Sequence, residues 1–244
     1  MTYSFKPFLL VLFCVFISCN VDEDANKNNE DNNFNTVNEV PEEPNDNTPL
    51  TATYTVEFIG EWTAESHPNM FPNDDHFSKT ILLTHDANVT LFTEGELAST
   101  GIEDMSEIGD NDNLEVEMQT LISAGEANQY KIGPASIPGN GTDLLTVEAT
   151  QNFSKLSYVA MIAPSPDWFS GVSSVSLFEN GSWVNTVEID VKAYDAGTEN
   201  GNTFSYDNAE TIPQQPITQI SDAPLGDGTT VSPRLGYLKI TLQE

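Results

Sequence analysis

The sequence predicts an all-β fold, an antiparallel β-sandwich with one or two short helices. Many short segments rich in β-branched and aromatic residues are separated by clusters of Gly, Pro, Asn and Asp, as expected for strands joined by turns. Only residues 101–125 place apolar residues at helical spacing. Many strands with few helices are typical of a sandwich of two sheets.

The individual elements follow from the hydrophobic pattern. Residues 53–58 alternate polar and apolar side chains, which is the period of a half-buried strand. The pair Asn180-Gly181 lies between two apolar segments and predicts a tight hairpin. Further strands are predicted at residues 80–84, 89–93, 144–148, 155–162, 172–178, 184–191 and 237–242. The helical residues are Ile102, Met105 and Ile108, followed by Leu114, Met118, Leu121 and Ile122.

The composition is strongly acidic and excludes several classes of partner. The chain of 244 residues has 38 Asp and Glu against 8 Lys and Arg, a formal net charge of −30. Such a chain is a poor ligand for nucleic acid, which requires basic residues to displace counterions, and has no basic patch for anionic lipid. It is compatible with a divalent cation as partner. The two cysteines, Cys14 and Cys19, lie near the start, so the remainder has neither a disulfide nor a cysteine-ligated zinc site.

The first fifty residues are predicted to be a targeting segment and a spacer. Lys6 precedes a short apolar run at residues 8–17, which is the pattern of a secretory signal. The segment Phe16-Ile17-Ser18-Cys19 resembles a bacterial lipobox, although Phe16 stands where Leu is usual. We therefore expect residues 1–18 to be a lipoprotein signal peptide and Cys19 to be lipidated; the alternative is an ordinary signal peptide with an incidental cysteine. Residues 19–50, rich in Asn, Asp and Glu, are expected to form a disordered acidic linker.

Residues 51–244 are predicted to form one domain, and two of its segments resemble a known family. The first is Ala-Pro-Ser-Pro-Asp-Trp-Phe-Ser-Gly at residues 163–171, and the second is Asp-Ala-Gly-Thr-Glu-Asn-Gly-Asn-Thr-Phe at residues 195–204. Together they resemble the spondin N-terminal domain of F-spondin-like matrix proteins and of many bacterial secreted proteins. Similarity extends through most of the domain, from Gly60-Glu61-Trp62 to Thr211-Ile212-Pro213-Gln214.

The resemblance implies a C2-like antiparallel β-sandwich with a calcium ion at one end. Carried over by position, the metal ligands are Asp167, Asp195 and Glu199; animal members have Asp where this chain has Glu199. The chemistry is consistent with that assignment, because three carboxylates repel each other unless a cation lies between them, and calcium prefers oxygen ligands. Gly197 lets the backbone turn so that Asp195 and Glu199 can face one point. The alternative is that these acids are ordinary solvated loop charges.

Other residues carry weaker signals. Trp168 and Phe169 follow the first predicted ligand, where they either pack in the core, which we favour, or contact a partner. His67, His76 and His85 recur at nine-residue steps, but they form no compact zinc motif, and we expect His85 to be a hydrogen-bonded structural residue.

Two functions from different classes remain. The leading hypothesis is a non-enzymatic, lipid-anchored, calcium-binding module at the bacterial outer membrane or cell surface. The resemblance implies an adhesive or matrix-binding role, with extracellular matrix, polysaccharide or a surface protein as partner. The alternative is a secreted metal-dependent hydrolase acting on extracellular polymer. A third interpretation is a structural surface-layer component without a specific ligand.

Overall fold

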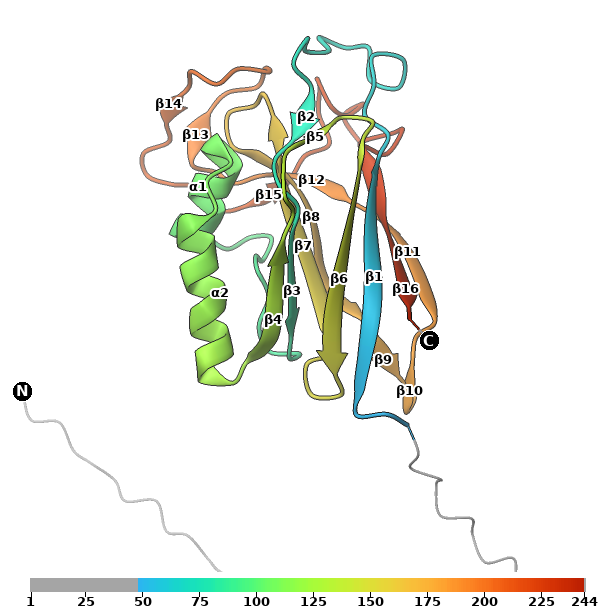
Figure 1. Cartoon of the computed structure of the whole chain (residues 1–244). Helices are drawn as coiled ribbons and strands as arrows, with labels where there is room; N and C mark the ends of the chain where they lie inside the picture. Colours follow the sequence, from blue (N-terminus) through green and yellow to red (C-terminus); the bar gives the residue numbers. More distant parts are fainter. Residues whose placement is uncertain (1–47, 244) are drawn as a thin grey trace, which may run out of the picture. The chain divides into compact units, whose positions relative to one another are not determined.

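Two antiparallel β-sheets pack face to face and confirm the predicted all-β sandwich (Figure 1). The first sheet has four strands in the order β11-β16-β1-β6. They are β11 (Thr186–Asp190), β16 (Gly236–Leu242), β1 (Thr51–Gly60) and β6 (Thr142–Thr150). Strand β1 pairs with β6 on one side and with β16 on the other, so it lies inside the sheet.

The second sheet is larger and follows the path β15-β12-β8-β7-β2-β5, with β3 pairing to both β7 and β4. Its strands are β15 (Thr218–Gln219), β12 (Lys192–Asp195), β8 (Trp168–Ser176), β7 (Lys155–Ala163), β2 (His76–Phe77), β5 (Ile137–Pro138), β3 (Ile81–His85) and β4 (Ala127–Ile132).

Two hairpins and two helices complete the part of the chain that the structure describes. The hairpins are β9 (Phe178–Glu179) with β10 (Ser182–Trp183), and β13 (Glu199–Asn200) with β14 (Ala209–Glu210); the helices are α1 (Thr100–Ile108) and α2 (Asp112–Ala124). The Asn180-Gly181 turn is confirmed: both residues have positive φ, as a two-residue hairpin of the favoured hand requires. Gly109 ends α1 in the left-handed conformation, which explains why the helical segment forms two helices.

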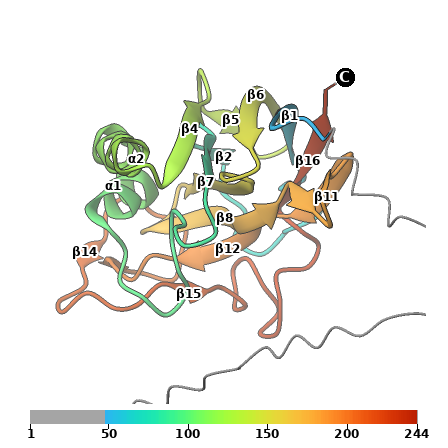
Figure 2. The same cartoon turned by 90° about the horizontal axis from the view of Figure 1, so that it is seen from below.

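The sandwich has two hydrophobic cores, one on each side of the larger sheet. Strand β7 supplies both, because successive side chains point to opposite faces. Tyr158 and Ile162 pack between the two sheets, whereas Val159 and Met161 pack under the helices. Figure 2 shows this arrangement along the strands: α1 and α2 lie beside β4 and β7, and the four-stranded sheet lies on the other side. Burial on both faces explains the nearly continuous apolar sequence of β7.

The predicted strand at residues 89–93 is wrong. These residues form a loop rather than a ladder, although Leu91 and Phe92 are buried in the core under the helices. The Phe92 ring packs edge-on against the rings of Phe169 and Tyr194, at centroid distances of 5.0 and 4.8 Å. A loop that inserts apolar side chains into a core therefore has the same pattern as a short strand.

The two ends of the sandwich carry different features. Residues before β1 join the fold beside the β9–β10 hairpin, where the Trp183 Nε1–H donates to the Pro49 carbonyl at 2.7 Å. Hairpin β13–β14 and the C-terminal end of β7 lie at the opposite end of the strands (Figure 1). The predicted metal ligands lie after β7, at the end of β12 and at the start of β13, so they belong to this far end.

The structure, a computed structural model, describes residues 48–243, which belong to one compact unit. The predicted signal peptide, the lipidation of Cys19 and nearly all of the linker lie outside the described residues. Neither helix in the described range has the length and apolar character needed to cross a membrane.

Candidate metal centre

Asp167 is the most deeply buried of the three predicted ligands. It lies between β7 and β8 with no exposed surface. Its Oδ2 accepts hydrogen bonds from the Thr198 amide at 2.7 Å, the Thr198 hydroxyl at 3.3 Å and the Glu199 amide at 3.0 Å. Its Oδ1 is buried without a hydrogen-bond partner among the described residues. Burial raises the pKa of Asp167, and the amide donors oppose that shift.

Asp195 ends β12 and is the cross-strand neighbour of Trp168. Its Oδ1 accepts a hydrogen bond from the Gly197 amide at 2.9 Å. Gly197 has φ of +76°, and a Cβ there would lie 2.2 Å from the Gln215 carbonyl oxygen, so this turn requires glycine. Burial and then the charge of Asp167 raise the pKa of Asp195 to about 6, against the Gly197 and Trp168 hydrogen bonds. The two aspartates are therefore close enough to repel each other.

Glu199 contributes its backbone to Asp167, while its carboxylate is directed elsewhere. Glu199 Oε2 accepts a hydrogen bond from Asn208 Nδ2 at 3.3 Å. Burial raises the pKa of Glu199, and the charge of Asp167 adds to that increase, against the Asn208 hydrogen bond. The carboxylate thus lies in the field of Asp167 but is held by the loop between β13 and β14.

Glu107 is a neighbour of these acids that the sequence interpretation missed. It lies in the last turn of α1. Burial raises its pKa; the Thr198 side chain opposes the shift, and the charges of Glu199, Glu103 and Asp167 contribute to it. Helical periodicity predicted α1. It could not show that this carboxylate lies near loops that are sixty or more residues later in the sequence.

The arrangement fits a hard cation only in part. Asp167 Oδ1 is a buried oxygen without a partner among the described residues, and Asp195 supplies a second negative charge beside it. Oxygen-only donors are those that calcium prefers. However, among residues 48–243 no three His, Cys, Asp or Glu side chains are grouped closely enough to hold a metal ion. The structure therefore brings Asp167 and Asp195 together, while Glu199 would have to release Asn208 to join them.

Trp168 and Phe169 are core residues. Phe169 is fully buried and stacks on Tyr194 with a centroid distance of 5.3 Å, and Trp168 is 3% exposed. This burial agrees with the favoured core interpretation, and contact with a partner stays a prediction. Strand β8 begins directly after Asp167, so the two rings point to opposite faces and enter the two cores; the Trp168 ring also packs edge-on against Phe204 of the β13–β14 loop.

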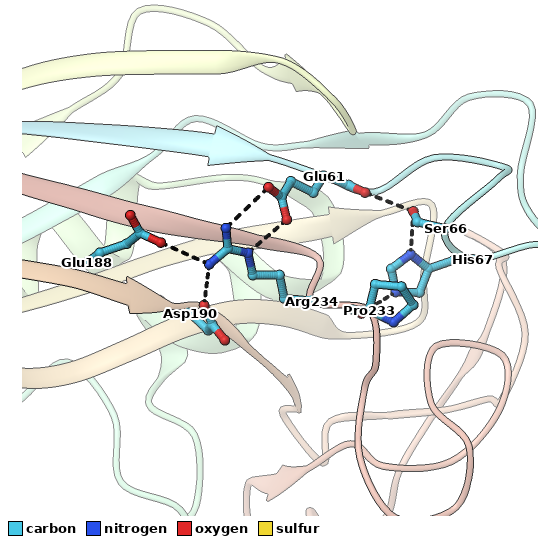
Figure 3. A network of polar contacts seen from close by, with 7 residues as sticks. All are labelled: Glu61, Ser66, His67, Glu188, Asp190, Pro233 and Arg234. Atoms are coloured by element: carbon cyan, nitrogen blue, oxygen red, sulfur yellow. Dashed lines mark hydrogen bonds and ion pairs between the residues drawn. The ribbon is translucent and has the colours of Figure 1, made fainter.

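The three histidines lie in separate places. His67 Nε2 donates to the Pro233 carbonyl at 2.9 Å, and its Nδ1 accepts from Ser66 (Figure 3). His85 is fully buried, with Nδ1 donating to the Asp86 carbonyl at 2.7 Å and Nε2 accepting from the Ser157 hydroxyl at 2.8 Å. The expectation that His85 is a hydrogen-bonded structural residue is confirmed.

A second acidic cluster surrounds Arg234, close to the end of β1 (Figure 3). The guanidinium forms ion pairs with Glu61 at 2.8 Å, Glu188 at 3.2 Å and Asp190 at 2.7 Å. Its carbon lies 3.9 Å from the centroid of the Tyr237 ring. Arg234 thus connects the loop before β16 with β1 and β11.

Comparison with known proteins finds related sequences over most of the described residues. The family model described as Spondin_N matches residues 52–228. Spondin-2 of rat is 33% identical over 177 residues, and human spondin-2 is 32% identical over 179; each match covers 70% of this chain and 53% of the relative. Chicken spondin-1 is 29% identical over 199 residues, which cover 78% of this chain and 24% of the relative. The matched region thus spans about half the length of the spondin-2 relatives. The chain belongs to the spondin N-terminal domain family.

Proposed function

We propose that this protein is a calcium-binding cell-surface module of spondin type with an adhesive or matrix-binding role. The observation that carries the proposal is the buried, unpartnered Oδ1 of Asp167 beside the carboxylate of Asp195 in the described residues. A buried carboxylate oxygen without a partner is costly, and a second negative charge nearby increases that cost. A divalent cation bound by both carboxylates would remove the two penalties together.

The chain's own residues supply part of a calcium shell. Asp167 and Asp195 would provide the first two carboxylates, and Glu199 would provide a third after releasing Asn208. Calcium takes six to eight oxygens, so backbone carbonyls and water would complete the coordination. Because Glu199 is one methylene longer than the Asp of animal members, it can reach the ion from a less constrained loop position. Binding would fix the loops after β7 and β12 relative to each other.

The position of the site supports a role in contact with a partner. The acids lie at the end of the sandwich opposite the point where the residues before β1 join it (Figure 1). With Cys19 lipidated and residues 19–50 as a spacer, the tether would join the sandwich at the other end and leave these loops accessible to a partner. Animal members of the family are associated with matrix and adhesion, which favours extracellular matrix, polysaccharide or a surface protein as partner. The secreted metal-dependent hydrolase remains the alternative, and no specific contact in the described residues favours it.

Calcium titration by calorimetry tests the proposal. We expect saturable binding of CaCl₂ to the wild-type protein and its loss in Asp167→Asn, because the amide keeps the shape but removes the charge. Glu199→Gln should weaken binding less than Asp167→Asn. Glu126→Gln, an exposed acid between α2 and β4, is the matched control and should bind like the wild type. Equal calcium affinity in Asp167→Asn and the wild type would remove this site from the proposal.

Adhesion assays separate the module from the enzyme. Protein-coated beads should bind immobilised matrix or bacterial surface material in calcium and should lose that binding in chelator. A hydrolase would instead release soluble fragments from an extracellular polymer, and Asp195→Asn would abolish the release without unfolding the protein. Fragment release that follows this pattern would replace the adhesive role with the hydrolase.

A further inference from the structure

A cavity in the described part of the chain lies beside the candidate metal centre. It has a volume of about 490 Å³, within the range of small-molecule sites. Its walls come from β2 and the residues after it, the C-terminal end of α1, the end of β7 and the loop that carries Tyr206. Ala163 lines the cavity and ends β7, four residues before Asp167, so the cavity and the candidate metal centre share one end of the sandwich.

The cavity presents both hydrogen-bond donors and acceptors. Lys79 and Glu107 line it, and all ion pairs within residues 48–243 are made by Arg234, so these two side chains have no charged partner there. His76 Nδ1 donates to the Asp74 carbonyl at 2.8 Å, so Nε2 is the ring nitrogen that remains for a ligand. The cavity thus offers an ammonium, a carboxylate and an imidazole nitrogen to one ligand.

Apolar surface lies between these polar groups. Met161 is nearly buried, and Ile108 is 72% exposed although it ends an otherwise well-packed helix. Tyr206 is 52% exposed, and its hydroxyl donates to Asp74 Oδ2 at 3.3 Å. That hydrogen bond fixes the edge of the ring and leaves its face available for packing.

We propose that this cavity binds a neutral saccharide unit of an extracellular polymer. A sugar ring has an apolar C–H face that packs on an aromatic ring, and its hydroxyls require donors and acceptors at once. Lys79 and Glu107 supply one charge of each sign, so the cavity has no net charge with which to bind an anion. The acidic surface of the chain disfavours anionic polymers further, since like charges repel. The inference rests on the proposed surface-binding role and names a ligand class for it.

Affinity electrophoresis of the folded protein tests the inference, with laminarin, dextran and yeast mannan as neutral probes and alginate as the anionic probe. At least one neutral polysaccharide should retard the wild-type protein, and alginate should not. Lys79→Met and Tyr206→Ala should each weaken retardation about tenfold or more, since each loses a charged hydrogen bond or a stacking surface. Tyr206→Phe keeps the ring but loses the hydrogen bond to Asp74, so it should weaken retardation less than Tyr206→Ala. Lys131→Met, at an exposed lysine on β4 outside the cavity, should bind like the wild type. Thermal melts establish that each variant is folded.

The outcomes separate this site from the calcium site. No retardation by any neutral probe, or equal retardation of all folded variants, overturns the saccharide site, as does retardation by alginate alone. Calcium titration of the same variants should give wild-type affinity for Lys79→Met and Tyr206→Ala. If saccharide binding fails while calcium binding and adhesion persist, only the ligand class is wrong. A further outcome is that the wild type binds a neutral polysaccharide but no calcium, with weaker retardation of the cavity variants. That result keeps the saccharide site and removes calcium from the proposed function.

Discussion

Two clusters of acids lie toward the same end of this sandwich, and they differ in whether a basic side chain of the described residues pairs with them. Around Arg234, three partly exposed carboxylates share one guanidinium. Around Asp167, which is buried, the half-buried Asp195 lies within reach of its charge, and Glu199 and Glu107 add to the field, with no Lys or Arg pairing them in the described residues. The first cluster contains its own cation, and the second does not.

The difference in burial between the two clusters determines where a cation from solution can affect stability. Exposed acids are screened by water and salt, so the Arg234 cluster contributes modestly to stability. Buried acids are poorly screened, so the Asp167 cluster costs more when it is ionised and unpaired. A cation supplied from solution therefore changes the free energy of the second cluster much more than that of the first.

The largest expected effect is stabilisation by calcium. Calcium at about 100 times its dissociation constant should add about 2.7 kcal/mol to the free energy of unfolding. For a domain of this size that corresponds to a rise in Tm of about 5–10 °C. Differential scanning calorimetry with CaCl₂ or with EDTA measures it. Asp167→Asn should show no rise, whereas Arg234→Met should show the full rise. A calcium-induced rise that survives Asp167→Asn contradicts this assignment.

The next effect is stabilisation of the calcium-free protein by Asp195→Asn. The raised pKa of Asp195, about 6 against about 3.9 in the unfolded chain, means that its contribution to stability is complete below pH 4 and is lost as the pH rises through 6. At pH 7.5 the neutral amide avoids that loss, and we expect a gain of about 1–2 kcal/mol in EDTA. Urea denaturation measures the gain. In saturating calcium, Asp195→Asn should instead lower the free energy of unfolding, because a metal ligand is lost. A loss of stability in EDTA would show that the aspartates do not repel each other.

Removal of the built-in cation should have a smaller effect of the opposite sign. Arg234→Met should lower the free energy of unfolding by about 1–2 kcal/mol, because three partly exposed ion pairs and the contact with Tyr237 are lost. Salt at 1 M should reduce the difference from the wild type. Urea denaturation at low and high salt measures it, with Lys131→Met as control. A difference that salt leaves unchanged would assign the contribution to packing.

The smallest expected effect is the loss of stability at low pH that comes from protonation of His85. Burial lowers the pKa of His85, and the charge of Lys155 lowers it slightly further. The hydrogen bond to the Asp86 carbonyl and the charge of the Asp86 carboxylate oppose that shift. The stability that the neutral ring provides is therefore complete above about pH 6.5 and declines as the pH falls below that value. Between pH 7.5 and 5.5, in saturating calcium, the wild-type Tm should fall by about 2 °C more than that of His85→Gln. Parallel pH profiles of the two proteins would contradict this prediction.

The local elements of the fold could be predicted, because their causes are local. The alternation in β1 reflects one buried face, and the Asn180-Gly181 turn reflects the φ values that only a few residues adopt readily. Strand β12 was not predicted, because Lys192 interrupts the apolar pattern and the strand depends on its pairing with β8. The strand predicted at residues 89–93 was wrong because an apolar pattern alone does not distinguish a strand from a loop inserted into the core.

The site could be predicted only where the family motifs carry it. Asp167 and Asp195 lie close together as their motifs imply, but the hydrogen bond from Asn208 that holds Glu199 away depends on the β13–β14 loop. Glu107 and the partners of Arg234 could not be found from spacing, because 44 to 173 residues separate Arg234 from the acids it contacts. Such contacts depend on how the sheets pack, which no short segment of sequence encodes.

The placement of β1 determines how the sandwich carries mechanical load. Residues before Thr51 join β1 at one end of the strand, and the acidic loops lie at the other (Figure 1). A partner that pulls on those loops while the N-terminal side is held would load β1 along its own axis. Its hydrogen bonds to β6 and β16 then resist together in shear and do not open one by one. Strand β1 would thus be held on both sides against a force applied between its first residue and the acidic loops.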